Sequence, residues 1–499
     1  MQISPFVMVI FGATGDLTAR KLLPAIYHLL EQGVIPERFF VVGVARRLFS
    51  DREFRNLIKD NIVKFGKVKF KEEIWEKLEK NLYYQQGLFE EEEPYTQLVS
   101  QLKKFDKEIG ACITRFFYLA TPPQHYSTII SHLDKAKLDE GCGQGSSRWT
   151  RILIEKPFGH NMETAAQLEN QLTQTFESRQ IYRIDHYLAK ESIQNILAFR
   201  FANRSLEAVW NRENIDHVQI TLFESGGIGN RGRFYDEVGA LRDTAQNHLM
   251  AMLAYTTMEE PKSLIADDIR SERVRVLSKL CCLDESNVSK TVVRGQYGEA
   301  LINDKRINGY RQEKDINPES VTETYVAFKL SIDNNRWRGV PFYFRTGKRM
   351  KQSVVRIDIQ FKNPLTSLFS KYTSAEDAHT NVLTFRIQPK EGITLRFFAK
   401  SPGLSYALEP VDMDFSYSSS FKREITDSYE KLFIDAMMGD QTLFATGAGF
   451  AATWKLANSI LIAWNKMPKP KFPNYEAGSW GPKEADELIE KDGRHWLLH

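Results

Sequence analysis

Four side chains that can bind anions or move protons lie together in the stretch RIDHYLAKE, which follows an apolar approach typical of a buried strand. They are Asp185, His186, Tyr187 and Lys190. An imidazole, a phenol and an ammonium group near a helix N-terminus form a good anion site, because the helix dipole adds to their attraction. We expect Asp185 to cap a helix on which His186 and Lys190, four residues apart, share one face. The alternative is that these groups are hydrogen-bonded members of the core.

A histidine that could act as a base occurs later, in the stretch DTAQNHLM, which has a helical pattern. Removing a hydride from an alcohol or hemiacetal requires a base for the hydroxyl proton near pH 7, and histidine suits this task best. Such a base works better when a carboxylate fixes its tautomer. Asp243 and His248 are therefore candidate site residues, although a lone histidine in such a segment is more often a packed structural residue.

Lys156 directly follows an apolar run in the stretch LIEKPFG, and Pro157 cannot continue the ladder of a strand. If the run is a strand of a parallel sheet, Lys156 emerges at the carboxyl edge, where ligands bind. The alternative is an ordinary lysine at the end of a strand.

A glycine turn lies near the start of the chain, in the stretch VMVIFGATGDLTARKL. The pattern predicts a buried strand, then a tight turn through Gly12 and Gly15, then a helix. Glycines in this position allow the backbone to approach a pyrophosphate, which the free N–H groups of the helix N-terminus then meet. The spacing differs from G-x-G-x-x-G, so a purely steric use of the glycines remains open. Pro24 predicts a kink or an early end of this helix.

Two arginines, Arg46 and Arg47, end the second apolar run, VVGVARR. An acidic residue at this place usually holds the ribose hydroxyl of NAD, whereas arginine pairs with the 2′-phosphate of NADP. Thr14 in the glycine turn could add a hydroxyl donor. Both arginines could instead be solvated surface charges, but the two features together favour NADP.

The elements that must position these residues form two patterns. In the first third of the chain, apolar runs alternate with helical patterns, which predicts βαβ units and a parallel sheet. After about residue 205, runs with a period of two predict an antiparallel sheet with one face covered. The fold class we expect is an α/β, Rossmann-like domain at 1–185, followed by an α+β domain with a large, mainly antiparallel sheet at 186–499.

The composition is that of a globular protein, with 42% apolar and 26% charged residues among 499. The net charge of +3 argues against nucleic acid as a partner. The apolar stretch ATWKLANSILIAW is too short to span a bilayer, so we expect no membrane contact. Four cysteines show no metal spacing and are too few for a disulfide framework, which favours a reducing cytoplasm.

Several of these stretches, in this order, resemble landmarks of the glucose-6-phosphate dehydrogenase family across almost the whole chain. They are GATGDLTARKLLPAIY, EKPFG, RIDHYLAKE, NHLMAML, FRTGKRM and GPKEADEL. The resemblance implies oxidation of glucose 6-phosphate at C1 with NADP, the first step of the oxidative pentose phosphate pathway. It also implies a cytoplasmic homodimer or dimer of dimers, formed through the large sheet, with no metal.

The resemblance assigns roles to individual residues. The cofactor-binding residues are Gly12, Thr14, Gly15, Asp16, Leu17, Lys21, Arg46 and Lys156. His248 is the general base, Asp185 is its paired carboxylate, and Lys156 lies near nicotinamide and sugar. The substrate-binding residues are Lys156, His186, Tyr187, Lys190, Glu224, Asp243, His248, Lys348 and Gln388.

Two positions depart from the family pattern: Ala189 replaces a glycine, and Ser353 stands where a second basic residue is common. Our hypothesis is that Lys351 reaches the sugar phosphate in place of that residue, because lysine has a long flexible stem. Two other functions stay open. One is an NADP-dependent oxidoreductase of another sugar or an inositol, and the other is a non-catalytic NADP sensor or scaffold. Asp185 and His248 argue against the sensor, which has no use for a base.

Overall fold

The computed structural model describes residues 3–142, 150–363, 381–404, 406–421 and 426–498. The chain forms two compact units. The first contains 1–189 with two later segments, 264–270 and 426–447, and the second contains the rest of the chain.

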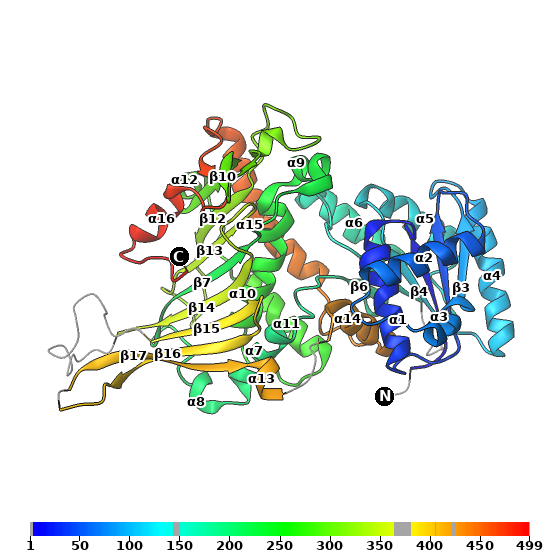
Figure 1. Ribbon diagram of the computed structural model, residues 1–499, viewed down its shortest axis with the longest axis horizontal. Helices are drawn as coiled ribbons and strands as arrows, with labels where there is room; N and C mark the ends of the chain where they lie inside the picture. Colours follow the sequence, from blue (N-terminus) through cyan, green and yellow to red (C-terminus); the bar gives the residue numbers. More distant parts are fainter. Residues whose placement is uncertain (1–2, 143–149, 364–380, 405, 422–425, 499) are drawn as a thin grey trace. The chain divides into compact units, whose positions relative to one another are not determined.

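The first unit is built on a six-stranded parallel sheet with the order β3-β2-β1-β4-β5-β6 (Figure 1). Its strands are β1 (Phe6–Phe11), β2 (Phe39–Ala45), β3 (Leu82–Gln86), β4 (Thr114–Leu119), β5 (Thr150–Ile154) and β6 (Ile181–Arg183). β1, β2 and β4 are buried along their whole length, as continuous apolar runs in parallel sheets are. The Rossmann-like prediction is confirmed.

Helices connect and flank these strands. They are α1 (Leu23–Glu31), α2 (Asp51–Phe65), α3 (Glu72–Glu79), α4 (Glu93–Ile109), α5 (Tyr126–Lys135), α6 (Met162–Thr175) and α14 (Ser428–Met438). α14 comes from far along the chain and is fixed to the unit by polar contacts. His28 Nδ1 lies 2.7 Å from Glu430 Oε1, and the Arg151 guanidinium donates to the Ala436 carbonyl at 2.9 Å.

A disulfide joins Cys112 to Cys142, in the loops that follow α4 and α5. The bridge lies at the amino edge of the parallel sheet, the edge opposite to the glycine turn, because β4 begins at Thr114. The sequence analysis did not foresee this pairing.

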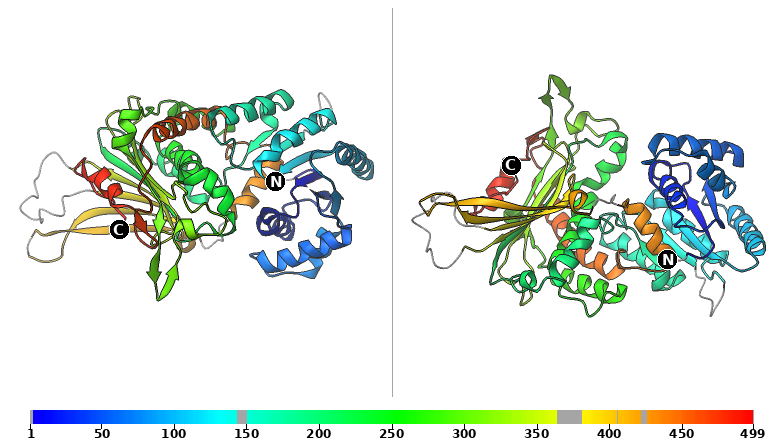
Figure 2. Two further views of the ribbon diagram at one scale, coloured as in Figure 1. Left: turned by 90° about the horizontal axis from the view of Figure 1, so that it is seen from above. Right: turned by 60° about the horizontal axis from the view of Figure 1, so that its bottom comes forward.

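The second unit is built on an eight-stranded sheet with the order β17-β16-β15-β14-β7-β13-β12-β8. The strands are β7 (Ile215–Phe223), β8 (Val292–Gly295), β12 (Tyr325–Leu330), β13 (Phe342–Gly347), β14 (Val354–Phe361), β15 (Val382–Gln388), β16 (Gly392–Lys400) and β17 (Leu408–Ser416). All neighbours are antiparallel except β7 and β13, so the mainly antiparallel sheet is confirmed. β16 and β17 form a long hairpin at one edge, visible in every view of Figures 1 and 2. Two small sheets add β10 (Ala300–Ile302) with β11 (Lys305–Ile307), and β9 (Tyr297–Gly298) with β18 (Tyr475–Glu476).

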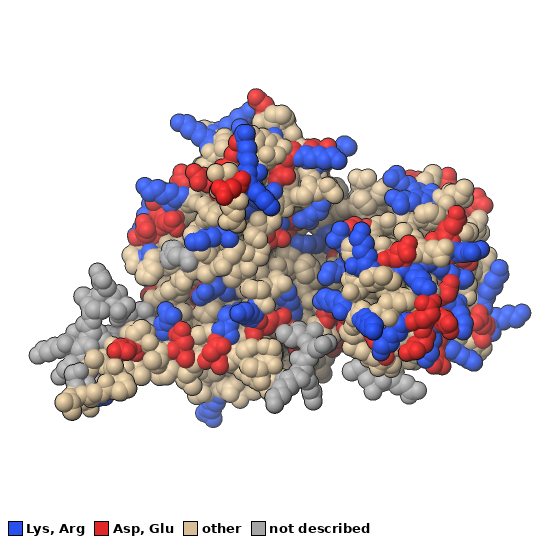
Figure 3. Space-filling model, viewed as in Figure 1, with Lys and Arg blue, Asp and Glu red and all other residues tan. Residues whose placement is uncertain are grey.

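The remaining helices are α7 (Glu191–Phe201), α8 (Arg204–Glu207), α9 (Gly232–Ala240), α10 (Met250–Thr257), α11 (Ala266–Leu277), α12 (Glu285–Thr291), α13 (Tyr417–Phe421), α15 (Gly447–Lys466) and α16 (Lys483–Glu490). None of the helices in the described part of the chain has the length and apolar character needed to cross a membrane. The face drawn in Figure 3 carries basic and acidic side chains close to one another, in keeping with the small net charge.

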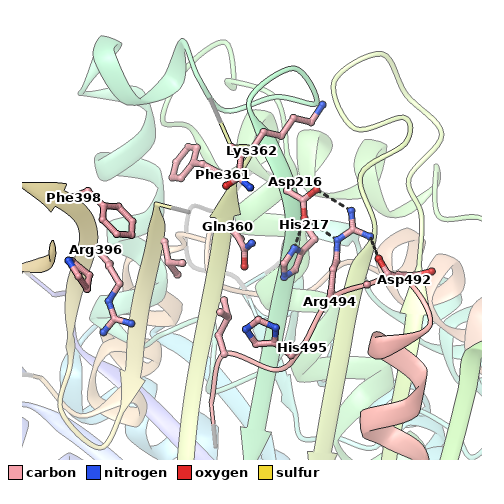
Figure 4. A pocket seen from close by; sticks show the side chains of 15 residues that line it. Asp216, His217, Gln360, Phe361, Lys362, Arg396, Phe398, Asp492, Arg494 and His495 are labelled. Carbon is pink, nitrogen blue, oxygen red and sulfur yellow. Dashed lines mark hydrogen bonds and ion pairs between the residues drawn. The ribbon is translucent and has the colours of Figure 1, made fainter. Parts of the chain in front are cut away.

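The segment that follows α16 lies across the large sheet beside a cavity of about 630 Å³ (Figure 4). Arg494 binds both carboxylate oxygens of Asp216 on β7, at 2.8 and 2.9 Å. The Asp216 carboxylate also accepts from His217 Nδ1 at 2.7 Å. Gln219, two residues on, donates to the His495 carbonyl and accepts from the Leu497 amide. These contacts fasten the segment to β7.

Candidate active site

The glycine turn adopts a backbone that requires glycine. Gly12 has φ +87°, and a Cβ there would lie 2.4 Å from the Ala120 carbonyl oxygen. The Gly12 amide donates to the Val44 carbonyl at 2.9 Å, and the Gly15 amide to the Gly12 carbonyl at 2.9 Å. The turn therefore packs directly against the ends of β2 and β4. Thr14 and Asp16 lie in this turn, and Asp16 forms an ion pair with Arg20 at 2.6 Å.

A π-helix, Thr18–Leu22, follows the turn and precedes α1. Pro24 lies in the first turn of α1, but the chain stays helical from residue 16 to residue 31, so the helix does not end early at Pro24. Lys21 lies on the π-helix with its side chain exposed, and its ammonium is 3.9 Å from Asp427 at the start of α14. Leu17 is the residue immediately before the π-helix.

Arg46 and Lys156 follow β2 and β5 at the carboxyl edge of the sheet, where Gly12 follows β1. The Tyr84 hydroxyl donates to the carbonyls of Ala45 and Arg47 and fixes the backbone there. The Arg46 side chain is exposed. Cofactor candidates from three strands therefore gather along one edge of the first unit.

The stretch 184–190 forms a turn, not the first turn of a helix. The Asp185 carboxylate accepts from the Tyr187 amide at 3.0 Å, and the Asp185 carbonyl accepts from the Leu188 amide at 3.0 Å. Lys190 has extended backbone, and α7 begins only at Glu191. The expectation that His186 and Lys190 share a helical face is therefore wrong, because the Asp185 side chain closes a turn before the helix starts. Asp185 itself is buried.

In the second unit, three candidate substrate residues meet. Lys348 forms an ion pair with Glu224, and its ammonium lies 3.5 Å from Asp243 Oδ2. Glu224 and Lys348 follow β7 and β13, which are parallel neighbours with Phe223 opposite Gly347, so their positions are adjacent. The Glu224 amide donates to the Gly347 carbonyl at 3.0 Å. Two carboxylates around one buried ammonium provide both acceptors and a donor for sugar hydroxyls.

Asp243 and His248 lie on a second π-helix, Leu241–Leu249, a rare structure that is frequent at functional sites. Gly239 precedes it with φ +69°, and the Glu323 carboxylate fills the space beside that glycine. Glu323 also accepts from the Leu241 amide at 3.0 Å and so caps the π-helix. The His248 side chain is buried. The sequence analysis missed Glu323, which lies 82 residues from the amide that it holds.

The last two candidates lie at the end of β15 and in the loop between β13 and β14. Gln388 ends β15 and is exposed. Lys351 is exposed, with its ammonium 5.3 Å from the centre of the Trp480 ring. Ser353, where the family pattern has a basic residue, accepts from the Ser225 amide at 2.9 Å.

Each unit therefore contains its own group of candidates. The first unit contains Gly12, Thr14, Gly15, Asp16, Leu17, Lys21, Arg46, Lys156, Asp185, His186 and Tyr187. The second contains Lys190, Glu224, Asp243, His248, Lys348 and Gln388.

The chain resembles known proteins over its full length. Residues 9–195 match the family model "Glucose-6-phosphate dehydrogenase, NAD binding domain", and residues 197–497 match "Glucose-6-phosphate dehydrogenase, C-terminal domain". "Glucose-6-phosphate 1-dehydrogenase" of Chlamydia pneumoniae is 44% identical over 493 residues, which cover 99% of this chain and 96% of that protein. The protein of the same name from Bacillus subtilis is 40% identical over 98% of both chains.

Solved structures agree. "Glucose-6-phosphate dehydrogenase in complex with its substrate glucose-6-phosphate" superposes with a TM-score of 0.89 at 31% identity and covers 99% of both chains. Glucose-6-phosphate 1-dehydrogenase from Mycobacterium avium gives 0.84 at 31% identity, covering 100% of this chain and 99% of that one. A mutant Gal80p from Saccharomyces cerevisiae, at 0.51 and 9% identity, shares the fold alone. The two matched models, the full-length relatives and the shared architecture together show that this chain belongs to the glucose-6-phosphate dehydrogenase family.

Proposed function

We propose that the protein oxidises glucose 6-phosphate at C1 to 6-phosphoglucono-1,5-lactone with NADP, the first step of the oxidative pentose phosphate pathway. The observation that carries this proposal is the meeting of Lys348, Glu224 and Asp243 in a chain whose relatives are glucose-6-phosphate 1-dehydrogenases over their whole length. This group offers the charged donors and acceptors that a polyhydroxylated sugar ring requires.

His248 is the proposed general base, which takes the proton of the C1 hydroxyl. Imidazole is the side chain best suited to take up a proton near neutral pH, and a carboxylate that accepts from its other nitrogen holds the tautomer and stabilises the imidazolium. We assign that carboxylate to Asp185. Lys156 is proposed to orient the sugar and the cofactor.

The residues at the carboxyl edge of the first sheet suit a dinucleotide with a 2′-phosphate. Gly12 allows the turn to pack closely against the residue that follows β4, where a Cβ would clash with the Ala120 carbonyl, and Arg46 offers an exposed guanidinium at the end of β2. Thr14, Gly15, Asp16, Leu17 and Lys21 complete the proposed site. NADP, when bound, supplies the nicotinamide carbon that accepts the hydride.

The sugar phosphate is assigned to the turn that leads into α7, through His186, Tyr187 and Lys190. Lys351 is proposed as a further phosphate ligand, and Gln388 as a contact of the sugar. Binding energy at the phosphate holds C1 in place at the other end of the substrate, which is how remote contacts accelerate a reaction.

Initial rates of NADP reduction with a panel of sugars test the proposal. We expect glucose 6-phosphate to be oxidised far more efficiently than glucose or inositol. Lys190→Ala and Lys351→Ala should each raise the KM for glucose 6-phosphate about tenfold, the loss of a charged hydrogen bond, and leave glucose unaffected. Equal losses with both sugars would exclude a phosphate contact for that lysine, and efficient oxidation of an unphosphorylated sugar would contradict the proposed substrate.

The proposed assembly is a homodimer or a dimer of dimers formed through the large sheet of the second unit, and the proposed location is the cytoplasm. A reducing cytoplasm would expose the Cys112–Cys142 disulfide to thiols, so its redox state there is itself worth measuring.

A further inference from the structure

Glu155, the residue between β5 and Lys156, is held by tyrosine hydroxyls from other elements. The Tyr118 hydroxyl, on β4, donates to Glu155 Oε1 at 2.6 Å. The Tyr429 hydroxyl, on α14, is hydrogen-bonded to the same carboxylate. Two phenols therefore converge on one carboxylate beside the lysine that is proposed to touch both cofactor and sugar. No part of the proposed mechanism accounts for this arrangement.

A third hydroxyl fixes the backbone at the same place. The Tyr126 hydroxyl, on α5, donates at 2.9 Å to the Glu155 carbonyl, which belongs to the peptide bond that leads into Lys156. Tyr118 and Tyr126 are fully buried, so neither can adjust its position easily. With its side chain and its carbonyl both fastened, Glu155 determines the direction in which the next residue leaves the strand.

Tyr429 links this clamp to the stretch 185–190. Its ring stacks on the His186 ring, with centroids 6.3 Å apart and planes 16° apart. Its amide donates to Asp427 Oδ1 at 2.9 Å, which fixes the start of α14. A residue from the distant segment 426–447 thus touches both Glu155 and a proposed phosphate ligand.

The charges around Glu155 make its protonation state matter. Burial raises the pKa of Glu155 to about 7, and this effect exceeds the opposing effects of the Tyr118 and Tyr429 hydroxyls and of the Lys156 ammonium. The Asp185 carboxylate raises this pKa further. Glu155 is therefore neutral below about pH 7 and ionised above it, when its charge attracts the Lys156 ammonium.

We propose that Glu155 is a positioning residue whose carboxylate, held by the Tyr118 and Tyr429 hydroxyls, sets the place of the Lys156 ammonium. This inference rests on the proposed function for Lys156. It predicts that the charge of Glu155, and not merely its shape, is needed for efficient turnover.

Glu155→Gln separates charge from shape, because glutamine keeps an acceptor for both phenols. We expect kcat/KM of this variant to equal that of the wild type at about pH 6, where Glu155 is itself neutral, and to be about tenfold lower at about pH 8. Dividing kcat/KM of the variant by that of the wild type at each pH cancels every titration that the two proteins share. A quotient that stays constant with pH would overturn the proposal.

Tyr118→Phe and Tyr429→Phe provide an independent check. Each removes a hydrogen bond that favours the carboxylate, so the pKa of Glu155 rises and full activity should require a higher pH. Both variants should regain wild-type kcat/KM as the pH rises, whereas Glu155→Gln should not. Tyr83→Phe, on β3, removes a partly buried hydroxyl elsewhere in the sheet and should follow the wild type throughout. Failure of both variants to recover would contradict a role through ionisation.

The reactivity of Lys156 tests the inference without any substrate. In the ligand-free protein at about pH 8, the rate at which acetic anhydride modifies Lys156 should differ about threefold or more between Glu155→Gln and the wild type, because the charge of Glu155 no longer holds the Lys156 side chain in place. Peptide mass spectrometry measures this rate. Equal rates would overturn the inference. If the two modification rates differ but the wild type does not oxidise glucose 6-phosphate, the proposed function is wrong, while the role of Glu155 in positioning Lys156 is supported.

Discussion

His248 and Asp185 are almost fully buried, with 3% and 4% of their surfaces exposed, and the proposed mechanism gives them one shared task. His248→Asn should lower kcat by about 10²–10⁴-fold, the usual contribution of a positioned base. Asp185→Asn should also lower kcat severely. The double variant should be little worse than His248→Asn, because a carboxylate that orients a base has nothing to orient once the base is gone.

A second buried histidine provides the control. His217 lies in the second unit, as His248 does, and its Nδ1 is hydrogen-bonded to Asp216. It has no role in the proposed mechanism. His217→Asn should leave kcat unchanged. If the losses from His248→Asn and Asp185→Asn simply multiply, the two residues do not act as a unit.

Arg46 is the residue that we expect to select NADP over NAD. Removing a charged hydrogen bond costs about 1.5–3 kcal/mol, or roughly ten- to a hundredfold in binding, so Arg46→Ala should raise the KM for NADP by this factor. The KM for NAD, which has no 2′-phosphate, should stay nearly constant. Arg38→Ala removes an exposed arginine next to the other end of β2 and serves as the control. An equal loss with both cofactors would assign Arg46 a structural role.

At the scale of elements, the segment 491–498 depends on a neutral His217. The Leu497 amide must donate to Gln219 Oε1, so the Gln219 amide nitrogen faces His217 Nε2 and donates to it at 2.9 Å. His217 Nδ1 then carries the proton and donates to Asp216. Burial lowers the pKa of His217, an effect that Asp216 only partly offsets. If His217 Nε2 were also protonated, its N–H group would face the side-chain N–H group of Gln219, and neither could accept a hydrogen bond from the other.

Lowering the pH should therefore weaken the contacts that hold the segment 491–498 to β7. A histidine whose pKa is lowered in the folded state binds protons more weakly than in the unfolded chain, so its contribution to stability is complete above the unfolded pKa of about 6.5 and is lost below it. We compare the free energies of unfolding in urea of the wild type and of His217→Asn. As the pH is lowered from about 6.5 to 5, the value for the wild type should fall relative to that of the variant by up to about 1.4 kcal/mol per pH unit. The difference between the two proteins removes the opposite slope of Glu155, whose pKa is raised. Parallel curves would mean that His217 does not titrate with unfolding.

Several elements could be predicted from the sequence, and others could not. β1, β2 and β4 are buried on both faces, so their apolar runs identify them. β3 (Leu82–Gln86) is partly exposed and polar, and β6 (Ile181–Arg183) has too few residues for a periodic signal. The turn at 185–190 was mistaken for a helix because a side-chain hydrogen bond, which leaves no periodic pattern, decides where α7 begins. The two π-helices also lack a distinctive pattern.

At the scale of the whole molecule, contacts between residues far apart in the sequence determine features of the fold that local sequence patterns do not predict. No feature of 264–270 or 426–447 marks these segments as parts of the first unit, yet α14 supplies Tyr429 to the clamp on Glu155. Glu224 and Lys348 lie 124 residues apart and meet because β7 and β13 pair in parallel. Family resemblance named both residues, but periodicity and spacing could not have brought them together.

The proposed dimer is a second property of the whole molecule. We expect sedimentation to give a mass of two or four chains of 57.6 kDa. Met413 on β17 has 61% of its surface exposed, on a strand of the large sheet through which the dimer is proposed to form. Met413→Asp should shift the equilibrium towards the monomer, because burying a charge without a partner is costly. Val63→Asp, an exposed site on α2 of the first unit, should leave the mass unchanged. A wild type that sediments as a monomer would contradict the proposed assembly.

The central claim is that the hydrogen on C1 of the sugar is transferred to the cofactor. A deuterium label at C1 traces this transfer directly. The protein is incubated with NADP and glucose 6-phosphate that carries deuterium at C1, and the reduced cofactor is analysed by mass spectrometry. The proposed function predicts that the NADPH carries the deuterium and that 6-phosphoglucono-1,5-lactone, or the acid formed by its hydrolysis, accumulates in equal amount. NADPH without deuterium, or no NADPH while another sugar is oxidised, would contradict it.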